Sequence, residues 1–202
     1  MKIKGPRVTI GDLKLDDVFQ MSRWGKHDNP LLGDYNFPDL SAREVNKWYR
    51  LKVGSIFNKY FSIRNEDGEL IGYMGIKDIK FIRRISTLGI VLDPTHMNKG
   101  YGTEILDTFL TYYFTDMKMR KMILEVAEFN KRAYRVYEKV GFRPIAYYLD
   151  EFYNHELDLM DPHYLEHKSS FVIDGKKIYN YIYKMVIKKK RFFSLRSKRE
   201  TI

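Results

Sequence analysis

The sequence contains no cysteine, which excludes disulfide bridges, thiolate metal sites and cysteine nucleophiles. It has no apolar run that approaches the about 20 residues of a membrane-spanning helix, and its N-terminus lacks the apolar core of a signal peptide. We therefore expect a cytoplasmic protein without an integral membrane segment. Its 202 residues are enough to bury the core of one domain and too few for two comfortable ones.

Acidic residues are scarce at the C-terminus. Residues 184–202 carry eight lysines and arginines against one glutamate, so they account for +7 of the formal net charge of +10. The remaining +3 is ordinary for a globular domain. We expect one domain over residues 1–187 and a basic tail over 188–202. The tail is either a solvated terminus or a weak contact for an anionic membrane surface or RNA.

The segment LGIVLDPTHMNKGYGTE, residues 88–104, reads as a strand that stops at a turn and leads into a helix. The strand ends at Asp93 because Pro94 cannot continue a sheet ladder. Gly100 and Gly102 then allow the backbone to approach a ligand closely. The free amides and the positive dipole end of the following helix favour an anion. Taken alone, the Gly-x-Gly pattern fits a plain turn as well as a phosphate site.

A second segment, MILEVAEFNKRAYRVYEKVGF, occupies residues 122–142. Its first six residues are apolar enough for a buried strand, Asn130 can cap a helix, and Gly141 can close that helix. The sequence therefore predicts a second strand-turn-helix unit after the first.

Together the two segments resemble the GNAT-type N-acetyltransferase superfamily. Its acetyl-CoA loop follows Q/R-x-x-G-x-G/A and its later helix follows N-x-x-A-x-x-x-Y-x-x-x-G-F, which here read MNKGYG and NKRAYRVYEKVGF. Met97 departs from the Q/R position, although backbone amides do most of the holding. The resemblance covers residues 60–142 and implies an α/β (α+β) fold. Its mixed central sheet would begin with an antiparallel meander, splay at the acetyl-CoA site and be flanked by helices.

The resemblance also implies acetyl-CoA as the cosubstrate, with loop amides on its pyrophosphate and its pantetheine arm along the earlier strand. A backbone amide of that strand would face the thioester oxygen and stabilise the oxyanion. The residues implied for cofactor binding are Ile90, Leu92, Met97, Asn98, Lys99, Gly100, Tyr101, Gly102, Thr103, Asn130 and Ala133.

Two side chains are the candidates for catalysis. Tyr137 occupies the tyrosine of the helix motif, which implies that it protonates the departing CoA thiolate, although its apolar stripe alone fits a core position. Glu125 lies in the segment LEV, where amino-terminal acetyltransferases of the superfamily place a general base. The alternative is a carboxylate paired with a lysine or arginine on the sheet surface. Glu128 is the reserve base, but strand alternation places it on the opposite face.

Local patterns predict the remaining elements. Ser41 and Glu44 form a capping box, and Asp67-Gly68 and Asp174-Gly175 mark two hairpins. The expected helices cover residues 13–22, 41–53, 103–117 and 131–140, and the expected strands 60–64, 70–76, 81–92, 122–127, 171–173 and 177–187, with another starting at 142. The tyrosines between Tyr179 and Tyr183 suit either a homodimer contact or the core.

The segment between Ala146 and Ser170 is rich in acids and histidines. We expect an acidic rim that attracts a cationic amine, formed by Asp150, Glu151, Glu156 and Asp158. A metal site from His155, His163 and His167 with Asp158 or Glu166 is the less favoured alternative, because the spacing is irregular, so no metal is predicted.

These patterns lead to one functional hypothesis and two alternatives. The hypothesis is an acyltransferase that transfers acetyl from acetyl-CoA to a primary amine by direct attack in a ternary complex. Its acceptor would be a protein N-terminus, a polyamine or a small amine. The alternatives are a CoA-binding regulatory domain without turnover, and a ribosome- or nucleic-acid-binding module that uses the basic tail.

Overall fold

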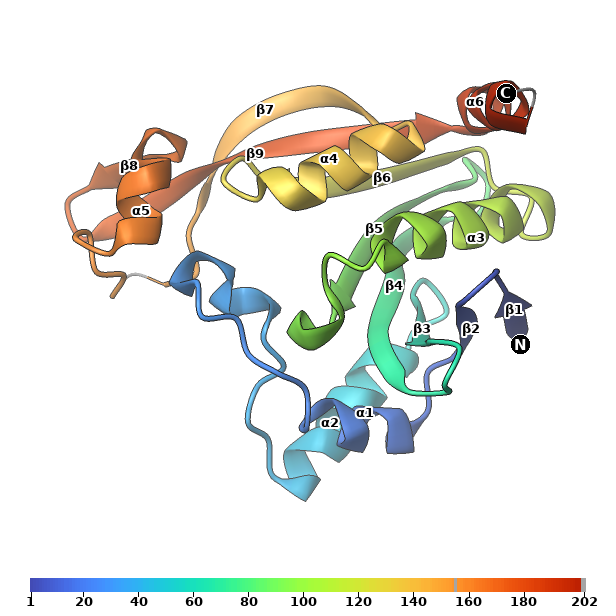
Figure 1. The fold of residues 1–202 in the computed structure, drawn as a ribbon, viewed down its shortest axis with the longest axis horizontal. Helices are drawn as coiled ribbons and strands as arrows, with labels where there is room; N and C mark the ends of the chain where they lie inside the picture. Colours follow the sequence, from blue (N-terminus) through green and yellow to red (C-terminus); the bar gives the residue numbers. More distant parts are fainter. Residues whose placement is uncertain (155, 201–202) are drawn as a thin grey trace.

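A computed structural model describes residues 1–154 and 156–200, which form one mixed sheet flanked by helices (Figure 1). In this part of the chain the sheet has nine strands in the order β1-β2-β3-β4-β5-β6-β9-β7, with β8 paired to β9. The strands are β1 (Lys2–Lys4), β2 (Thr9–Asp12), β3 (Lys59–Arg64), β4 (Leu70–Lys80), β5 (Ile85–Leu92), β6 (Lys121–Ala127), β7 (Arg143–Glu151), β8 (Phe171–Asp174) and β9 (Lys177–Lys188). The helices are α1 (Leu15–Met21), α2 (Ala42–Val53), α3 (Tyr101–Thr115), α4 (Lys131–Val140), α5 (Pro162–His167) and α6 (Lys189–Glu200).

The predicted meander and splay are confirmed. Strands β1 to β5 pair antiparallel with their neighbours, and β5 and β6 pair in parallel. The β5–β6 pairing stops at Thr87 and Ile123. Beyond these residues β5 stays with β4 as far as Leu92, and β6 stays with β9 as far as Ala127. The two strands therefore diverge and open a gap at their carboxyl ends.

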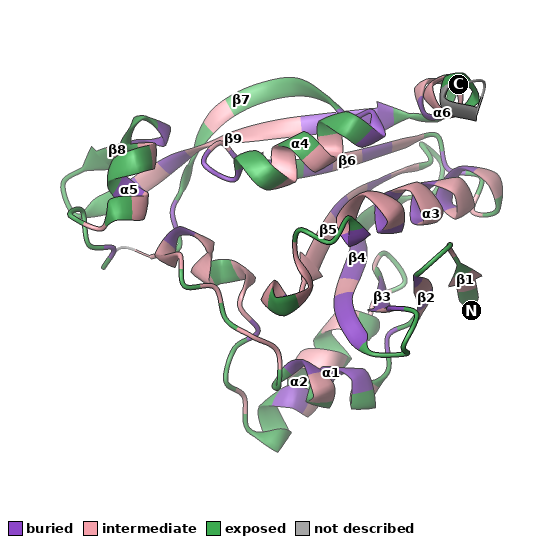
Figure 2. Cartoon of the chain, viewed as in Figure 1, coloured by how far each residue is buried: buried purple, intermediate pink, exposed green. Residues whose placement is uncertain are grey.

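Apolar clusters on both faces of the sheet hold it between helices. Neighbouring residues of β3 point to opposite faces, so Phe61 packs with α3 residues such as Phe109, while Tyr60 packs with α1 and α2. Figure 2 shows that β4 is buried over most of its length, whereas β7, at the sheet edge, is largely exposed. No helix of the described residues is long and apolar enough to cross a membrane.

The predicted strand over 81–92 begins later than expected. Residues 81–84 form the turn between β4 and β5, because the Arg84 amide bonds the Lys80 carbonyl at 2.7 Å and Arg84 adopts a φ of 56°. Alternation in the sequence continues across this turn, so the pattern alone does not reveal it. The short strands β1 and β2 were not predicted at all.

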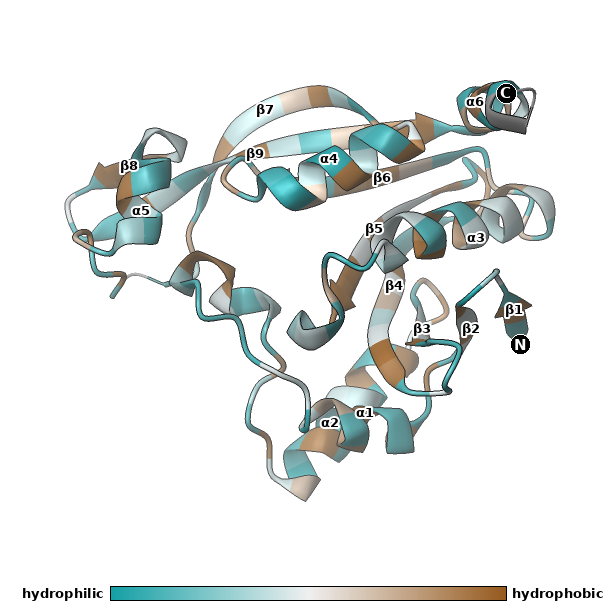
Figure 3. Cartoon of the chain, in the orientation of Figure 1, coloured by the Kyte–Doolittle hydropathy of each residue, from teal (hydrophilic) through white to brown (hydrophobic). Residues whose placement is uncertain are grey.

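The basic C-terminal segment, for which a solvated terminus was one of two interpretations, forms the helix α6. Phe192 of α6 is buried, with its ring 5.6 Å from that of Phe114, and the Arg191 Nε donates to the Gly141 carbonyl at 2.7 Å. Figure 3 shows hydrophobic residues interspersed among the hydrophilic residues of this helix. Deleting residues 188–202 would therefore uncover Phe114 and destabilise the domain. Residues 201 and 202 lie outside the described part.

The tyrosines of the last hairpin pack within the chain. The ring of Tyr147 lies 4.8 Å from the rings of both Tyr181 and Tyr183, and Tyr134 of α4 lies 5.1 Å from Tyr183. These hairpin side chains are half-buried, so they pack within the domain and still present part of their surface.

Candidate functional site

A cavity of about 270 Å³ lies at the carboxyl end of β5, beyond the point where β5 has separated from β6. Its walls come from the end of β5, the loop before α3, the first turns of α3 and α4, and the segment between α1 and α2. The lining residues are His27, Tyr35, Ile90, Val91, Leu92, His96, Met97, Asn98, Gly100, Tyr101, Gly102, Thr103, Leu106, Asn130, Arg132, Ala133, Val136 and Tyr137.

All the residues predicted for cofactor binding line this cavity except Lys99. The backbone carbonyl of Lys99 instead accepts a hydrogen bond from the Arg7 guanidinium at 3.2 Å. The catalytic candidate Tyr137 also lies in the cavity wall, whereas Glu125 does not. Two distant motifs of the sequence are thus brought to one site by the parallel β5–β6 pair.

The start of α3 offers backbone donors to an anion. Its N-cap, Gly100, has a φ of 84° and no side chain, so no side-chain cap bonds the first-turn amides. Those amides have no partner inside the helix, and the helix dipole adds positive potential at the same end. Asn98, with a φ of 62°, turns the preceding loop. The residues present therefore fit the pyrophosphate of a CoA group, independently of the side chain at Met97.

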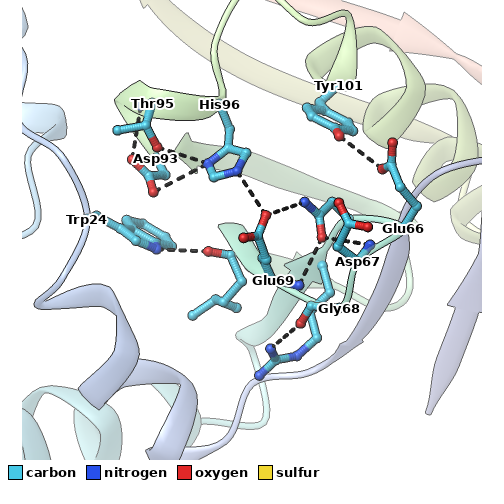
Figure 4. A network of polar contacts seen from close by, with 12 residues as sticks. Trp24, Glu66, Asp67, Gly68, Glu69, Asp93, Thr95, His96 and Tyr101 are labelled. Carbon is cyan, nitrogen blue, oxygen red and sulfur yellow. Dashed lines mark hydrogen bonds and ion pairs between the residues drawn. The ribbon is translucent and has the colours of Figure 1, made fainter.

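A polar network fixes the loop that carries these donors (Figure 4). The His96 imidazole lies 3.3 Å from a Glu69 carboxylate oxygen and 3.4 Å from the Asp93 carboxylate. The Asp93 carboxylate in turn accepts a hydrogen bond from the Thr95 amide at 3.0 Å. The Trp24 indole donates to the backbone carbonyl of Leu70, the residue after Glu69, at 2.9 Å. The loop is thereby tied to the β3–β4 hairpin.

A second set of contacts holds the first turn of α3. The Tyr101 hydroxyl donates to Glu66 at 2.9 Å, and Arg7 pairs with Glu104 at 2.8 Å. Arg7 also lies over the Tyr101 ring, 4.8 Å from its centre. Sequence reasoning missed Arg7, Glu66 and His96 in this role, because their partners Glu104, Tyr101 and Glu69 lie far away along the chain.

Tyr137 projects from α4 into the cavity wall and packs against Phe142, with the ring centres 5.9 Å apart. Burial raises the pKa of its phenol, and the neighbouring Tyr35 raises it further. The hydroxyl is therefore protonated at any physiological pH, as a proton donor to a leaving group must be. The predicted stripe of α4 is present, and Tyr137 stands where that stripe meets the cavity.

The segment between α1 and α2 contributes His27 and Tyr35, which sequence analysis did not single out for the site. Burial raises the pKa of Tyr35, while a hydrogen bond with Asn130 acts in the opposite direction. Burial and the charge of Arg132 lower the pKa of His27, so its imidazole is neutral at neutral pH. Tyr35 belongs to the loop LLGDYNFPDL, residues 31–40, and brings this loop to the cavity.

A second cavity of about 190 Å³ shares Tyr35 with the first. Four of its lining side chains are carboxylates and none is a lysine or arginine. They come from three places in the chain: Asp34 precedes α2, Glu125 lies on β6, and Asp150 and Glu151 lie at the end of β7. The structure thus joins an apolar-walled cavity with unpaired amides to a negatively charged one.

Glu125 is paired, as the alternative interpretation of this residue anticipated. Its carboxylate lies 3.0 Å from the Lys184 ammonium on β9. Burial acts to raise the pKa of Glu125, but hydrogen bonds from Lys184 and Tyr148 outweigh it and leave the pKa below its usual value. Glu128 accepts a hydrogen bond from Tyr147, whereas Glu125 accepts one from Tyr148. Because these two tyrosines are neighbours on β7 and point to opposite faces of the sheet, the two glutamates occupy opposite faces as predicted.

The predicted acidic rim is divided. Asp150 and Glu151 line the second cavity, whereas Glu156 and Asp158 do not. Glu156 and Asp158 belong to the segment before α5, where Asp158 accepts the Met160 amide at 2.8 Å. Among the described residues no three histidine or carboxylate side chains gather closely enough to hold a metal ion, and His155 lies outside that part.

Comparison with known proteins points to one family. The family model of the acetyltransferase (GNAT) domain matches residues 7–143. The spermidine N(1)-acetyltransferase of Vibrio cholerae is 23% identical over 170 residues, which are 84% of this chain and 95% of that protein. The N-alpha-acetyltransferase of Saccharolobus solfataricus is 24% identical over 163 residues, covering 74% and 90%. The V. cholerae spermidine N-acetyltransferase in complex with CoA and spermine has a similar fold, with a TM-score of 0.70 and 21% identity over 92% of this chain and 98% of that one.

Proposed function

The chain belongs to the GNAT acetyltransferase family, and we propose that this acetyl-CoA-dependent N-acetyltransferase acts on an acceptor with two or more amines, such as spermidine. The observation that carries the proposal is the second cavity, with four carboxylates and no basic side chain in its lining. Opposite charges several ångströms apart attract by about 1 kcal/mol in water and more near a protein surface. A polyamine would leave one neutral amine for attack while its other ammonium groups meet the carboxylates.

The first cavity supplies the machinery for transfer. Bound acetyl-CoA provides the activated thioester, and the α3 amides and the unpaired edge of β5 would hold its pyrophosphate and pantetheine arm. The amine nitrogen attacks the thioester carbon, the C–S bond breaks, and the amine loses a proton to water. We assign the proton that the departing thiolate takes up to the Tyr137 hydroxyl, which burial keeps protonated. Tyr35 lies where the two cavities meet, and so where amine and thioester would meet.

Neutralising two carboxylates of the second cavity tests the acceptor. We expect Asp34→Asn combined with Asp150→Asn to raise KM for spermidine by about thirtyfold, since each lost charge removes about 1 kcal/mol of attraction. KM for acetyl-CoA should stay unchanged. Steady-state kinetics with spermidine, with a monoamine and with an alanine-initiated peptide measure the effect.

The matched control is Glu156→Gln with Asp158→Asn, which removes the same charge from outside the cavity. Equal KM changes in the two double variants would mean that only the net charge of the protein matters, which would contradict the proposal. Faster acetylation of the peptide than of spermidine would replace the polyamine with a protein N-terminus as acceptor.

Glu125→Gln separates a binding role from a catalytic one. We propose that Glu125 attracts the acceptor, because it lines the acidic cavity and its lowered pKa makes it a weak base. The variant should raise KM for spermidine about fivefold and change kcat less than threefold, as expected for a lost charge at a partly solvated site. Glu128→Gln, on the opposite face, is the control. A loss of kcat of about a hundredfold, with loss of the acidic limb of the pH profile, would instead identify Glu125 as the base.

A further inference from the structure

Large apolar side chains are exposed at the turn between β4 and β5, on a surface separate from both cavities. Ile82, at the tip of the turn, is 98% exposed, and its neighbour Phe81 is 55% exposed. The segment before β3 adds Ile56 and Phe57, exposed by 74% and 53%. The rings of Phe57 and Phe81 lie 6.2 Å apart, so the four side chains belong to one protruding patch, which we call the apolar tip.

A basic groove of about 960 Å³ begins at Ile82 and runs beside the apolar tip. Six of its lining residues are lysines or arginines, and no aspartate or glutamate lines it. These are Arg83, Arg120, Lys121, Lys188, Lys189 and Lys190. Within the described part of the chain, none of these six side chains forms an ion pair with a carboxylate.

Sheet register explains why these cations meet. Ile85 pairs with Lys121 at the start of β5 and β6, and Lys121 pairs with Lys188 at the end of β9. The backbone continues the row, since the Arg120 amide bonds the Arg84 carbonyl and the Lys189 amide bonds the Arg120 carbonyl. In Figure 1 the β4–β5 turn and α6 lie at the same end of the sheet, whereas the loop before α3 follows the other end of β5.

We propose that the apolar tip and the basic groove together bind the surface of an anionic lipid bilayer. The cations would sit at the phosphate level of the headgroups while Phe81 and Ile82 enter the acyl boundary, the arrangement of charge and apolar area that favours interfacial binding. A polyanion without an apolar phase, such as RNA, would match the charge of the groove but would leave Ile82 in water. It therefore explains the basic groove and not the apolar tip. The first cavity is lined by the other end of β5, so the enzyme stays active when bound.

The buried Phe192 makes this surface a fixed one. Its ring holds the first turn of α6 against the core, so Lys189 and Lys190 are presented on a helix and not on a loose tail. Fixed cations lose little conformational entropy on binding. The membrane contact therefore belongs to the folded domain, and a peptide of the tail alone would lack the tip.

Sedimentation with vesicles tests the proposal. The full chain is mixed with vesicles of phosphatidylcholine and phosphatidylglycerol in equal amounts, or of phosphatidylcholine alone, and the bound fraction is followed by acetyltransferase activity and by protein staining. We expect binding to the anionic vesicles only. Arg83→Gln with Lys190→Gln should weaken it about thirtyfold, because each cation near such a surface contributes about a fivefold gain. Ile82→Ser should weaken it about tenfold, and this loss should persist at high salt, where charge is screened.

Matched controls keep the result specific. Lys168→Gln with Lys176→Gln removes the same charge from exposed positions near β8, and Ile145→Ser removes an exposed isoleucine from β7. Both should bind vesicles like the unchanged chain. Equal losses in the controls, stronger binding to poly(U) RNA than to the vesicles, or a change of oligomeric state caused by Ile82→Ser would each overturn the proposal. Activity of each variant in solution reports on the acetyltransferase function separately.

Discussion

Replacing Gly102 with glutamate is expected to raise the dissociation constant for acetyl-CoA by at least about a hundredfold. A Cβ at this position would lie 3.6 Å from Val136 and 3.9 Å from Leu92, both in the wall of the first cavity. A longer acidic side chain would therefore extend along that wall toward the amides of α3. Its charge would repel the pyrophosphate, and like charges about 4 Å apart cost between about 1 and 4 kcal/mol in partly solvated surroundings.

Thermal unfolding with acetyl-CoA measures the effect. At a ligand concentration 100 times the dissociation constant, binding stabilises the unchanged chain by about 2.7 kcal/mol, and a hundredfold weaker affinity reduces this to about 0.4 kcal/mol. The free variant should remain folded, because a glutamate in the first turn suits the helix dipole. Gly102→Ala is the control, since its Cβ makes ordinary contacts and adds no charge. Unaltered stabilisation of the glutamate variant would place the pyrophosphate elsewhere.

Tyr137→Phe should lower kcat by about a hundredfold to a thousandfold, the usual contribution of a positioned general acid. The ring and its contact with Phe142 remain, so the fold and KM for acetyl-CoA should change little. The loss should be smaller with an acyl thioester whose thiolate is a better leaving group, because that thiolate needs less help from a proton. Measuring kcat for both thioesters separates loss of an acid from a general disturbance of the site.

Tyr134→Phe is the matched control. Tyr134 lies one position after Ala133 on the same helix, but it packs on Tyr183 and does not line the cavity. Removing its hydroxyl should leave kcat unchanged. Equal rates for Tyr137→Phe and the unchanged chain would make Tyr137 a wall residue, as its apolar stripe by itself suggests.

The parts of the site that the sequence predicts are those encoded within a few residues. Gly100 and Asn130 each lie at a strand-to-helix turn, where a left-handed backbone or a side-chain cap leaves a readable signal. The capping box at Ser41 and the turn at Gly68 are local in the same sense, and both are present. The local patterns do not show that these two turns form one cavity. That prediction came from the resemblance to a family.

The acidic cavity could not be predicted, because it depends on sheet order. Asp34, Glu125 and Asp150 are separated by long stretches of chain and meet only where β9 lies between β6 and β7. Sequence analysis grouped Asp150 with Glu156 because they are near neighbours in the chain, but the chain leaves β7 before Glu156. The helix α6 escaped prediction for a related reason: its many lysines and arginines mask the buried side chain of Phe192.

The position of β9 also sets the order in which the molecule can be completed. Of the strands in the described residues, β9 comes last along the chain, yet it joins β6 to β7 and pairs with β8 on part of its length. Until residues 177–188 leave the ribosome, β6 has an unpaired apolar edge and β7 has no partner. Pairings so distant along the chain form slowly and leave such edges exposed to other nascent chains. We therefore expect activity to appear only after residues 177–188 have left the ribosome, although both motifs of the first cavity emerge before them.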